Sequence, residues 1–393
     1  MNETYDGRLQ TEAKHIILRH YLQELALITF QAGYYPVLTY IDGFSGPWES
    51  KGDDYSDTSF MIAIKVLKDV QDQLGARGLR PIVKCFFAER KASSFAELDR
   101  MVKPYHAPAE GFHVATFKGK FEDAIPDIMA FAEGFSLTFI DPTGWTNYAF
   151  DKIAPLLKRT PGEVLVNFMY DHISRFATSW DKPEIIESFN GILRPGWPDR
   201  IDKLLPPGKG AERLFKKEFK EAGGFKFVVS TPIKKLAERI HFCITYGTRH
   251  PKGLKVYRGV EYMALREHDF RRFESNLAKE VSGAQEFMFT ADDLHQKSTM
   301  DAELAAEKKA AAEWLESRLR EGGRSLLFQG VWHAMLETFT LRWTDARDVC
   351  KEMADRGIIL RTWKCAGSKR TKPDDRDWIS LVVPALVENS TSL

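Results

Sequence analysis

The chain has 393 residues, of which 44% are hydrophobic and 28% are charged, and its formal net charge at pH 7 is +1. A chain of this length buries a sizeable core and exceeds the usual size of one domain, so we expect two or three domains. The balanced charge excludes a globally basic nucleic-acid coat protein, and any contact with nucleic acid has to be regional.

The cysteines and the N-terminus indicate the compartment. The four cysteines lie far apart and none forms a C-x-x-C pair, whereas structural zinc needs ligands at close, paired spacing, so we expect free thiols and no metal site. The first ten residues are polar, and no apolar stretch has the length that crosses a bilayer. We therefore expect a cytoplasmic protein without membrane contact.

The segment from Val37 to Pro47 follows a predicted amphipathic helix at residues 11–32. It is an apolar run that predicts a buried parallel strand, followed by Asp42 and by two glycines, Gly43 and Gly46. Glycines directly after a strand let the backbone turn tightly and approach a ligand closely. This turn is therefore a candidate site for a nucleotide-like cofactor.

Strands and helices then alternate as far as residue 168. Helices are predicted at residues 57–74, with Asp57 as N-cap, and at 93–102, 121–131 and 150–157; strands are predicted at 82–88, 112–117, 137–140 and 163–168. The alternation predicts an α/β fold, a Rossmann-like parallel sheet with helices on both faces, whose strand order periodicity does not give.

The remainder of the sheet domain contains an insertion. Residues 170–223 predict a largely helical insertion rich in Pro, Gly and Trp, and residues 225–230 and 241–246 predict a pair of strands that closes the sheet. A short helix is predicted between these strands, at residues 232–238. We therefore place the boundary of this domain at residues 1–268.

The C-terminal third predicts a connector and a small module. Residues 269–321 are charged and helical, which is typical of a solvated helical connector. Residues 322–393 predict a winged helix-turn-helix domain, with helices at 326–338 and 344–356, the latter capped by Thr344, and a two-stranded wing at 358–363 and 378–383.

The tip of the predicted wing is basic. Its candidate nucleic-acid contacts are Lys364, Lys369, Arg370 and Lys372. Basic side chains of this kind contact phosphates, which position a protein without specifying sequence. The alternative is that the module makes dimer or intrachain contacts.

Three successive predicted strands end in a carboxylate, Asp42, Glu89 and Asp141. Ligands of open α/β sheets bind beyond the carboxyl ends of the strands, so these residues are expected to face one crevice. The chain contains neither G-x-x-x-x-G-K-[ST] nor G-x-G-x-x-G, which argues against a nucleotide hydrolase and a nicotinamide enzyme. A cofactor without a pyrophosphate remains, and S-adenosylmethionine fits.

The cofactor site is expected to have two parts. Asp42, Gly43, Phe44 and Gly46 would lie at the methionine end of S-adenosylmethionine, and Glu89 would accept hydrogen bonds from the ribose hydroxyls. The alternative for Glu89 is a surface acid beside Arg90 and Lys91, and its spacing from Asp42 exceeds that of the compact dinucleotide fingerprint.

The segment from Asp141 to Trp145 is the candidate catalytic site. In amino-group methylation a carboxylate such as Asp141, next to Pro142, can hold the acceptor N–H and aim the nitrogen lone pair at the methyl carbon. Trp145 could stack on a base taken out of its helix. The alternative is a turn at Asp141-Pro142 with Trp145 in the core. Three further residues, His250, Arg175 and Asn167, are ambiguous between a place near the cleft and a structural role.

Four segments together resemble the three-Cys-motif partner protein (TcmP) family over residues 11–268. They are Lys14-His15, Tyr40 to Gly46, Phe139-Ile140-Asp141-Pro142-x-Gly144, and Asn167-Phe168 followed by Arg175. The tail resembles the winged-helix module often joined to such proteins. The resemblance implies a class I methyltransferase-like, Rossmann-type fold and a protein partner that bears three cysteines.

Two departures from the family pattern bear on function. Trp48 stands where the family tends to carry Gly, which could crowd the methionine end, and Thr143 stands where an aromatic residue is usual. Our leading hypothesis is an S-adenosylmethionine-dependent methyltransferase acting on DNA or RNA. The alternatives are a non-catalytic methyltransferase-like partner protein, and a methyltransferase for a protein or small molecule.

Overall fold

The computed structural model describes residues 5, 8–33, 35–46, 50, 52, 54–176, 182–235, 239–281, 299–323, 325–363 and 369–382. Contacts within the chain divide it into two units, Met1–Gln296 (unit 1) and Lys297–Leu393 (unit 2). Each unit is described by itself.

Unit 1 contains a seven-stranded sheet in the order β3-β2-β1-β4-β5-β7-β6. The strands are β1 Val37–Asp42, β2 Ile82–Glu89, β3 Phe112–Lys118, β4 Phe135–Ile140, β5 Gly162–Phe168, β6 Phe227–Lys234 and β7 Ile240–Thr248. Strands β1 to β5 pair in parallel, whereas β7 is antiparallel to both β5 and β6. The expected α/β fold with a mostly parallel, Rossmann-like sheet is confirmed.

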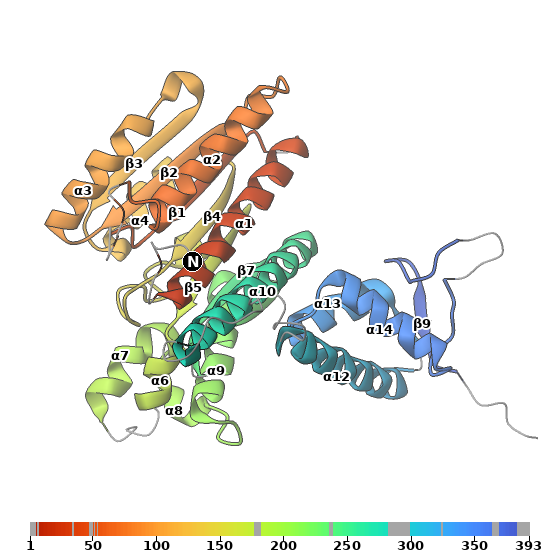
Figure 1. The fold of residues 1–393 in the computed structure, drawn as a ribbon. Helices are drawn as coiled ribbons and strands as arrows, with labels where there is room; N and C mark the ends of the chain where they lie inside the picture. Colours follow the sequence, from red (N-terminus) through yellow and green to blue (C-terminus); the bar gives the residue numbers. More distant parts are fainter. Residues whose placement is uncertain are drawn as a thin grey trace, which may run out of the picture. The chain divides into compact units, whose positions relative to one another are not determined.

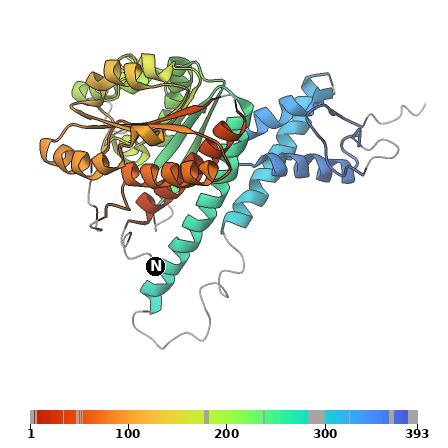
Figure 2. The ribbon, with the colours of Figure 1, turned by 90° about the horizontal axis from the view of Figure 1, so that it is seen from above.

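Helices lie on both sides of this sheet (Figures 1 and 2). They are α1 Leu9–Gln31, α2 Ser59–Gly75, α3 Ala92–Val102, α4 Ile125–Phe131, α5 Ala154–Leu157, α6 Tyr170–Phe176, α7 Pro183–Leu193, α8 Trp197–Arg200, α9 Pro207–Gly223 and α10 Pro251–Val281. Helix α1 packs between α2 and α10, and α9 packs against α5, α6 and α7. Strands covered on both faces read as continuous apolar runs, and all six residues of β1 are buried.

Two local expectations in unit 1 are wrong. Helix α2 is capped by Thr58, whose side chain accepts a bond from the backbone N–H of Met61, while the predicted cap, Asp57, pairs with Arg8 at 2.6 Å. The expected helix at 232–238 begins inside β6, which runs to Lys234; residues 236–238 lie outside the described part. Because β6 is an edge strand, it tolerates the missing N–H of Pro232.

The boundary expected at residue 268 falls inside α10, which runs Pro251–Val281. The expected solvated connector also differs from the structure, because α12 (Thr299–Glu321) belongs to unit 2 and buries Ala311, Leu315 and Leu319. Its many charged residues hide this apolar face from a reading of composition.

Unit 2 combines α12 with α13 (Phe328–Thr338), α14 (Trp343–Asp355) and the antiparallel strands β8 (Ser325–Leu327) and β9 (Trp378–Ser380). The N-cap of α14 is Arg342, not the expected Thr344, and its backbone N–H donates to Asp345 at 2.9 Å. The strand expected at 358–363 is reduced to one bridge between Ile359 and Leu381. In the parts of the chain described, no helix has the length and apolar character that crossing a membrane requires.

Gly134 and Gly33 are a matched pair for testing how tightly β4 is held beside β1. Both have positive φ, +60° and +71°, but a Cβ at Gly134 would lie 2.1 Å from the carbonyl oxygen of Val37, whereas nothing lies within 4 Å of one at Gly33. We expect Gly33→Ala to lower the free energy of unfolding by about 1–2 kcal/mol, through backbone strain alone. Gly134→Ala should cost at least about twice as much, because the β1 backbone must also move. Equal losses in urea denaturation followed by circular dichroism would contradict this.

Candidate functional site

The ends of β2, β1 and β4 lie side by side at one edge of the sheet, called here the carboxyl edge. In the register of these parallel strands Asp42 pairs with Phe87 of β2 and with Phe139 of β4. Glu89 and Asp141 each follow two residues after those partners, about 7 Å further along. The structure therefore brings the three predicted carboxylates to the same edge.

Asp42 is fully buried, and the protein itself uses its carboxylate. Ser59 of α2 donates a side-chain hydrogen bond to it at 2.6 Å, and the backbone N–H of Phe44 donates another at 3.0 Å. The pKa of Asp42 is raised to about 6, mainly by burial and to a lesser degree by the negative charge of Asp141, while the hydrogen bonds from Ser59 and Phe44 oppose this rise. Asp42 thus fixes the turn after β1, and it lies close enough to Asp141 for that charge to affect its pKa.

The turn after β1 is tied to both neighbouring strands. The N–H of Gly43 donates to the carbonyl of Phe139 at 3.2 Å, and that of Ser45 to the carbonyl of Ala88 at 2.9 Å. A Cβ at Gly43 would lie 2.5 Å from the ring of Phe121, so the missing side chain admits this ring. Gly46 is buried, and residues 47–49 lie outside the described part, so the crowding expected from Trp48 stays a prediction.

Glu89 ends β2 and is only 4% exposed. Its Oε1 accepts a hydrogen bond from the backbone N–H of Lys91 at 2.5 Å, and burial raises the pKa of its carboxyl. No cationic side chain among the described residues forms an ion pair with it. Glu89 is therefore a carboxylate at the carboxyl edge that keeps capacity to accept further hydrogen bonds.

Asp141 is held by residues from two other elements. Lys14 of α1 forms an ion pair with Oδ2, and the side-chain amide of Asn167, in β5, donates to Oδ1 at 2.7 Å. Asn167 is 3% exposed, and its Oδ1 has no hydrogen-bond partner among the described residues. A buried acceptor without a partner costs about 1–3 kcal/mol and calls for a donor, so this oxygen marks a place for an N–H or O–H group beside Asp141.

The predicted catalytic aromatic, Trp145, is anchored to the helical insertion. Its ring stacks on Phe189 of α7 with centroids 4.9 Å apart, and its Nε1–H donates to Ser188 at 2.9 Å. Phe189 thus takes one face of the indole, and base stacking by Trp145 stays a prediction. Pro142, which follows Asp141 in the chain, is buried.

A group of charged side chains lies further along the carboxyl edge, after β5. Asp171 of α6 forms ion pairs with Arg175, Lys235 and Arg239. Of these four residues, the sequence pattern marks only Arg175 as a candidate, ambiguous between a place near the cleft and a structural role. The i,i+4 spacing of Asp171 and Arg175 was the available local signal, whereas the pairing of Asp171 with the connection between β6 and β7 depends on the tertiary fold.

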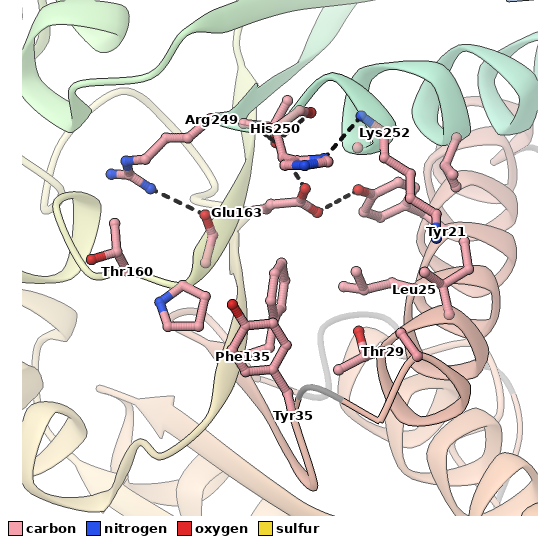
Figure 3. Close-up of a pocket in the computed structure, with 17 residues that line it drawn as sticks. Tyr21, Leu25, Thr29, Tyr35, Phe135, Thr160, Glu163, Arg249, His250 and Lys252 are labelled. Carbon is pink, nitrogen blue, oxygen red and sulfur yellow. Dashed lines mark hydrogen bonds between the residues drawn. The ribbon is translucent and has the colours of Figure 1, made fainter.

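A cavity of about 630 Å³ lies at the opposite, amino edge of the sheet (Figure 3). Its walls come from α1, the segments that start β4 and β5, and the junction of β7 with α10. The buried Glu163 accepts hydrogen bonds from Tyr21 at 2.5 Å and from Thr248 at 2.8 Å. His250, whose Nδ1 accepts from the backbone N–H of Lys252 at 3.1 Å, lines this cavity. The prediction that His250 approaches the cleft is therefore wrong, because the cleft was expected at the carboxyl edge.

The cavity's polar groups serve the fold. Arg249 donates to the backbone carbonyls of Leu157 at 2.7 Å and of Gly162 at 3.1 Å, and its guanidinium lies 4.7 Å from the centre of the Phe225 ring. Glu163 is likewise satisfied by hydroxyl groups. These contacts join α1, β5 and β7.

The basic tip predicted in unit 2 is partly neutralised by neighbouring acids. Arg370 pairs with Asp377 at 3.0 Å, and Lys372 pairs with Asp348. Lys369 is exposed, and Lys364 lies outside the described residues. Nucleic-acid binding by this tip stays a prediction.

Comparisons with known proteins name no family for this chain. No family model matches it, and no curated protein matches it. Among solved structures, it is similar to the crystal structure of protein LPL1258 from Legionella pneumophila, described by the family model DUF519. The two are 12% identical, the match covers 65% of this chain and 92% of that chain, and the TM-score is 0.38.

The buried carboxyl of Asp42 makes stability depend on pH. Its pKa of about 6 in the folded protein exceeds the ordinary value of 3.8, so the folded state binds the proton more tightly than the unfolded state. As pH falls from about 6 to about 4, the free energy of unfolding of the wild type should rise relative to Asp42→Asn by on the order of 2–3 kcal/mol. Urea denaturation of both proteins across this range measures the difference, and parallel curves would contradict the assignment.

Proposed function

We propose that unit 1 is an S-adenosylmethionine-dependent methyltransferase domain that acts on nucleic acid, with an amino group as the methyl acceptor. The observation that carries the proposal is the gathering of Asp42, Glu89 and Asp141 at one edge of three adjoining parallel strands. The strand order, with β7 antiparallel between β5 and β6, supports it, since this order is typical of class I methyltransferases. The resemblance to three-Cys-motif partner proteins points the same way.

The residues after β1 and β2 fit the cofactor. Glu89, buried and without a cationic partner among the described residues, is suited to accept hydrogen bonds from two adjacent ribose hydroxyls. Asp42 holds the turn through Gly43, Phe44 and Gly46, which would face the methionine end. When bound, S-adenosylmethionine supplies an electrophilic methyl group.

The cluster around Asp141 fits an amino acceptor. Lys14 forms an ion pair with the Asp141 carboxylate, and the side-chain amide of Asn167 donates a hydrogen bond that fixes its orientation. An acceptor N–H that donates to Asp141 or to the unpartnered Oδ1 of Asn167 would be held so that the nitrogen lone pair points away from these oxygens, toward the methyl carbon. Transfer of the methyl group would break its bond to the cofactor sulfur and leave a thioether. The methylated nitrogen would then lose one proton, to the Asp141 carboxylate or to water.

Unit 2 is proposed to be a winged helix-turn-helix module that presents nucleic acid. It has two consecutive helices, α13 and α14, between the strands β8 and β9, which pair antiparallel, and its exposed Lys369 lies on the connection from α14 to β9. Contacts from that connection would be to phosphates.

A non-catalytic role is the second candidate. The ring of Phe121 covers Gly43, where a cofactor's methionine end would lie, and Lys14 already occupies Asp141. In this case the domain serves assembly with a protein partner bearing three cysteines, and the sheet carries no chemistry.

Binding of the cofactor tests the first proposal. We expect S-adenosylmethionine to bind the full-length protein in a calorimetric titration, and Glu89→Gln to weaken binding by about 10- to 100-fold, because a charged acceptor is lost from the ribose. Glu133→Gln is the control, since its side chain is 65% exposed and pairs with Lys84 at the amino edge. No binding by the wild type, or equal binding by all three proteins, would contradict the cofactor site.

Methyl transfer tests the acceptor site. We expect Asp141→Asn to slow transfer of a radiolabelled methyl group to RNA or DNA by at least about 100-fold while cofactor affinity stays unchanged, because the acceptor is no longer held in line. Lys14→Arg, which keeps the positive charge, should retain more activity than Lys14→Met. Cofactor binding without transfer to either nucleic acid would favour the non-catalytic role.

A further inference from the structure

The Asp171 cluster, defined as Asp171, Arg175, Lys235 and Arg239, joins three elements of unit 1. Asp171 lies in the first turn of α6, where Arg175 pairs with it at 2.6 Å across one turn. Lys235, directly after β6, reaches the same carboxylate at 3.1 Å, and Arg239, directly before β7, pairs with its other oxygen.

Among the described residues, the cluster carries more positive charge than its carboxylate can neutralise. Three cations pair with one anion there, which gives the four side chains a formal charge of +2. His241 lies 3.9 Å from Asp171, and burial together with Lys235 lowers its pKa to about 4, so the ring is neutral at pH 7. On α10, Arg272 donates to the backbone carbonyl of Lys235 at 3.0 Å, and Asp269 lies 3.8 Å from Arg272.

The cations lie outward and the carboxylate lies inward. The side chain of Asp171 is 1% exposed, whereas those of Arg175 and Arg239 are each 56% exposed and that of Lys235 is 35% exposed. The three pairs with Asp171 keep the pKa of its carboxyl well below the ordinary value, despite the opposing effect of burial. A buried anion thus holds three exposed cations together against their mutual repulsion.

The cluster adjoins the candidate acceptor site. Asp171 lies four residues after Asn167, whose side-chain amide donates a hydrogen bond to Asp141. On the β7 side, the ring of Phe242 lies 5.9 Å from Nζ of Lys14, which pairs with Asp141. The excess charge therefore lies along the carboxyl edge beside Asp141.

We infer that the Asp171 cluster binds backbone phosphates of the nucleic-acid strand whose base or amino group reaches Asp141. This inference rests on the proposed function of unit 1 and adds to it a substrate contact outside unit 2. Arginine forks match phosphate oxygens, and contacts of this kind fix the position of a strand without reading its sequence. A phosphate in the cluster would also relieve the repulsion among the cations.

The test uses the full-length protein and fluorescein-labelled single-stranded RNA and DNA of 20 nucleotides, with binding measured by anisotropy at several salt concentrations. The double variant Lys235→Gln, Arg239→Gln retains the Arg175–Asp171 pair. Because each lost phosphate contact lowers the slope of log K against log salt by about 0.7 on single strands, we expect the slope to fall by about 1.4. The swap Lys235→Arg, Arg239→Lys keeps both charges and should keep the slope.

A matched control removes two cations that are each paired with one acid, so that neither pair carries a net charge. Lys65 pairs with Asp54 at 2.9 Å and Arg213 with Asp202 at 2.8 Å, one cation to one acid. Lys65→Gln, Arg213→Gln should leave the slope unchanged. An equal loss in control and cluster variants, a loss in the charge-keeping swap, or no binding by the wild type would overturn the inference. Equal competition by poly-L-glutamate would assign the cluster to acidic polypeptides and would overturn it as well.

Titration of the same variants with S-adenosylmethionine separates this inference from the proposed function. Cofactor binding with an unchanged salt slope in the cluster variant would remove the phosphate site and leave the methyltransferase assignment. A reduced slope without cofactor binding by any protein would do the reverse.

Discussion

The parallel register of β2, β1 and β4 is the constraint on which the site depends. It sets Glu89 and Asp141 equally far beyond the partners of Asp42, so that three acids from distant parts of the sequence share one edge. Like charges at short range repel, and the protein accommodates these acids in different ways. Asp42 is buried, has a raised pKa, and accepts hydrogen bonds from the Ser59 hydroxyl and the backbone N–H of Phe44. Asp141 is paired with Lys14. Environment therefore separates the roles of chemically similar residues.

Much of unit 1 could be predicted from the sequence, because strands buried on both faces leave short, mainly apolar runs, such as those of β1 and of Val164 to Val166 in β5. Strand order could not, since periodicity carries no information on which strands pair. The same limit explains the partners of the acids. The family resemblance drew attention to Lys14 and Asn167, but their meeting at Asp141 depends on the tertiary fold, in which β5 lies beside β4 and α1 brings Lys14 to the same edge.

The errors have local physical causes. Thr58 and Asp57 are both good caps, and Asp57 is instead taken by Arg8 from the start of α1. Pro232 suggested the start of a helix, yet an edge strand accommodates it. In α12, four buried apolar residues stand among many charged ones, and the helix belongs to unit 2. The Asp171 cluster was invisible because its cations come from separate elements.

Helix α1 connects the two edges of the sheet. Tyr21, near its middle, is bonded to Glu163, and Lys14 lies seven residues earlier on the same face, about 10 Å along the axis. The hydrogen bond from Tyr21 to Glu163 therefore helps to fix the position of α1, and with it the position of Lys14 at the carboxyl edge. A protein shortened to begin at β1 would retain the sequence of every strand but lose the counter-ion of Asp141, so this leading helix is part of the candidate site at the carboxyl edge.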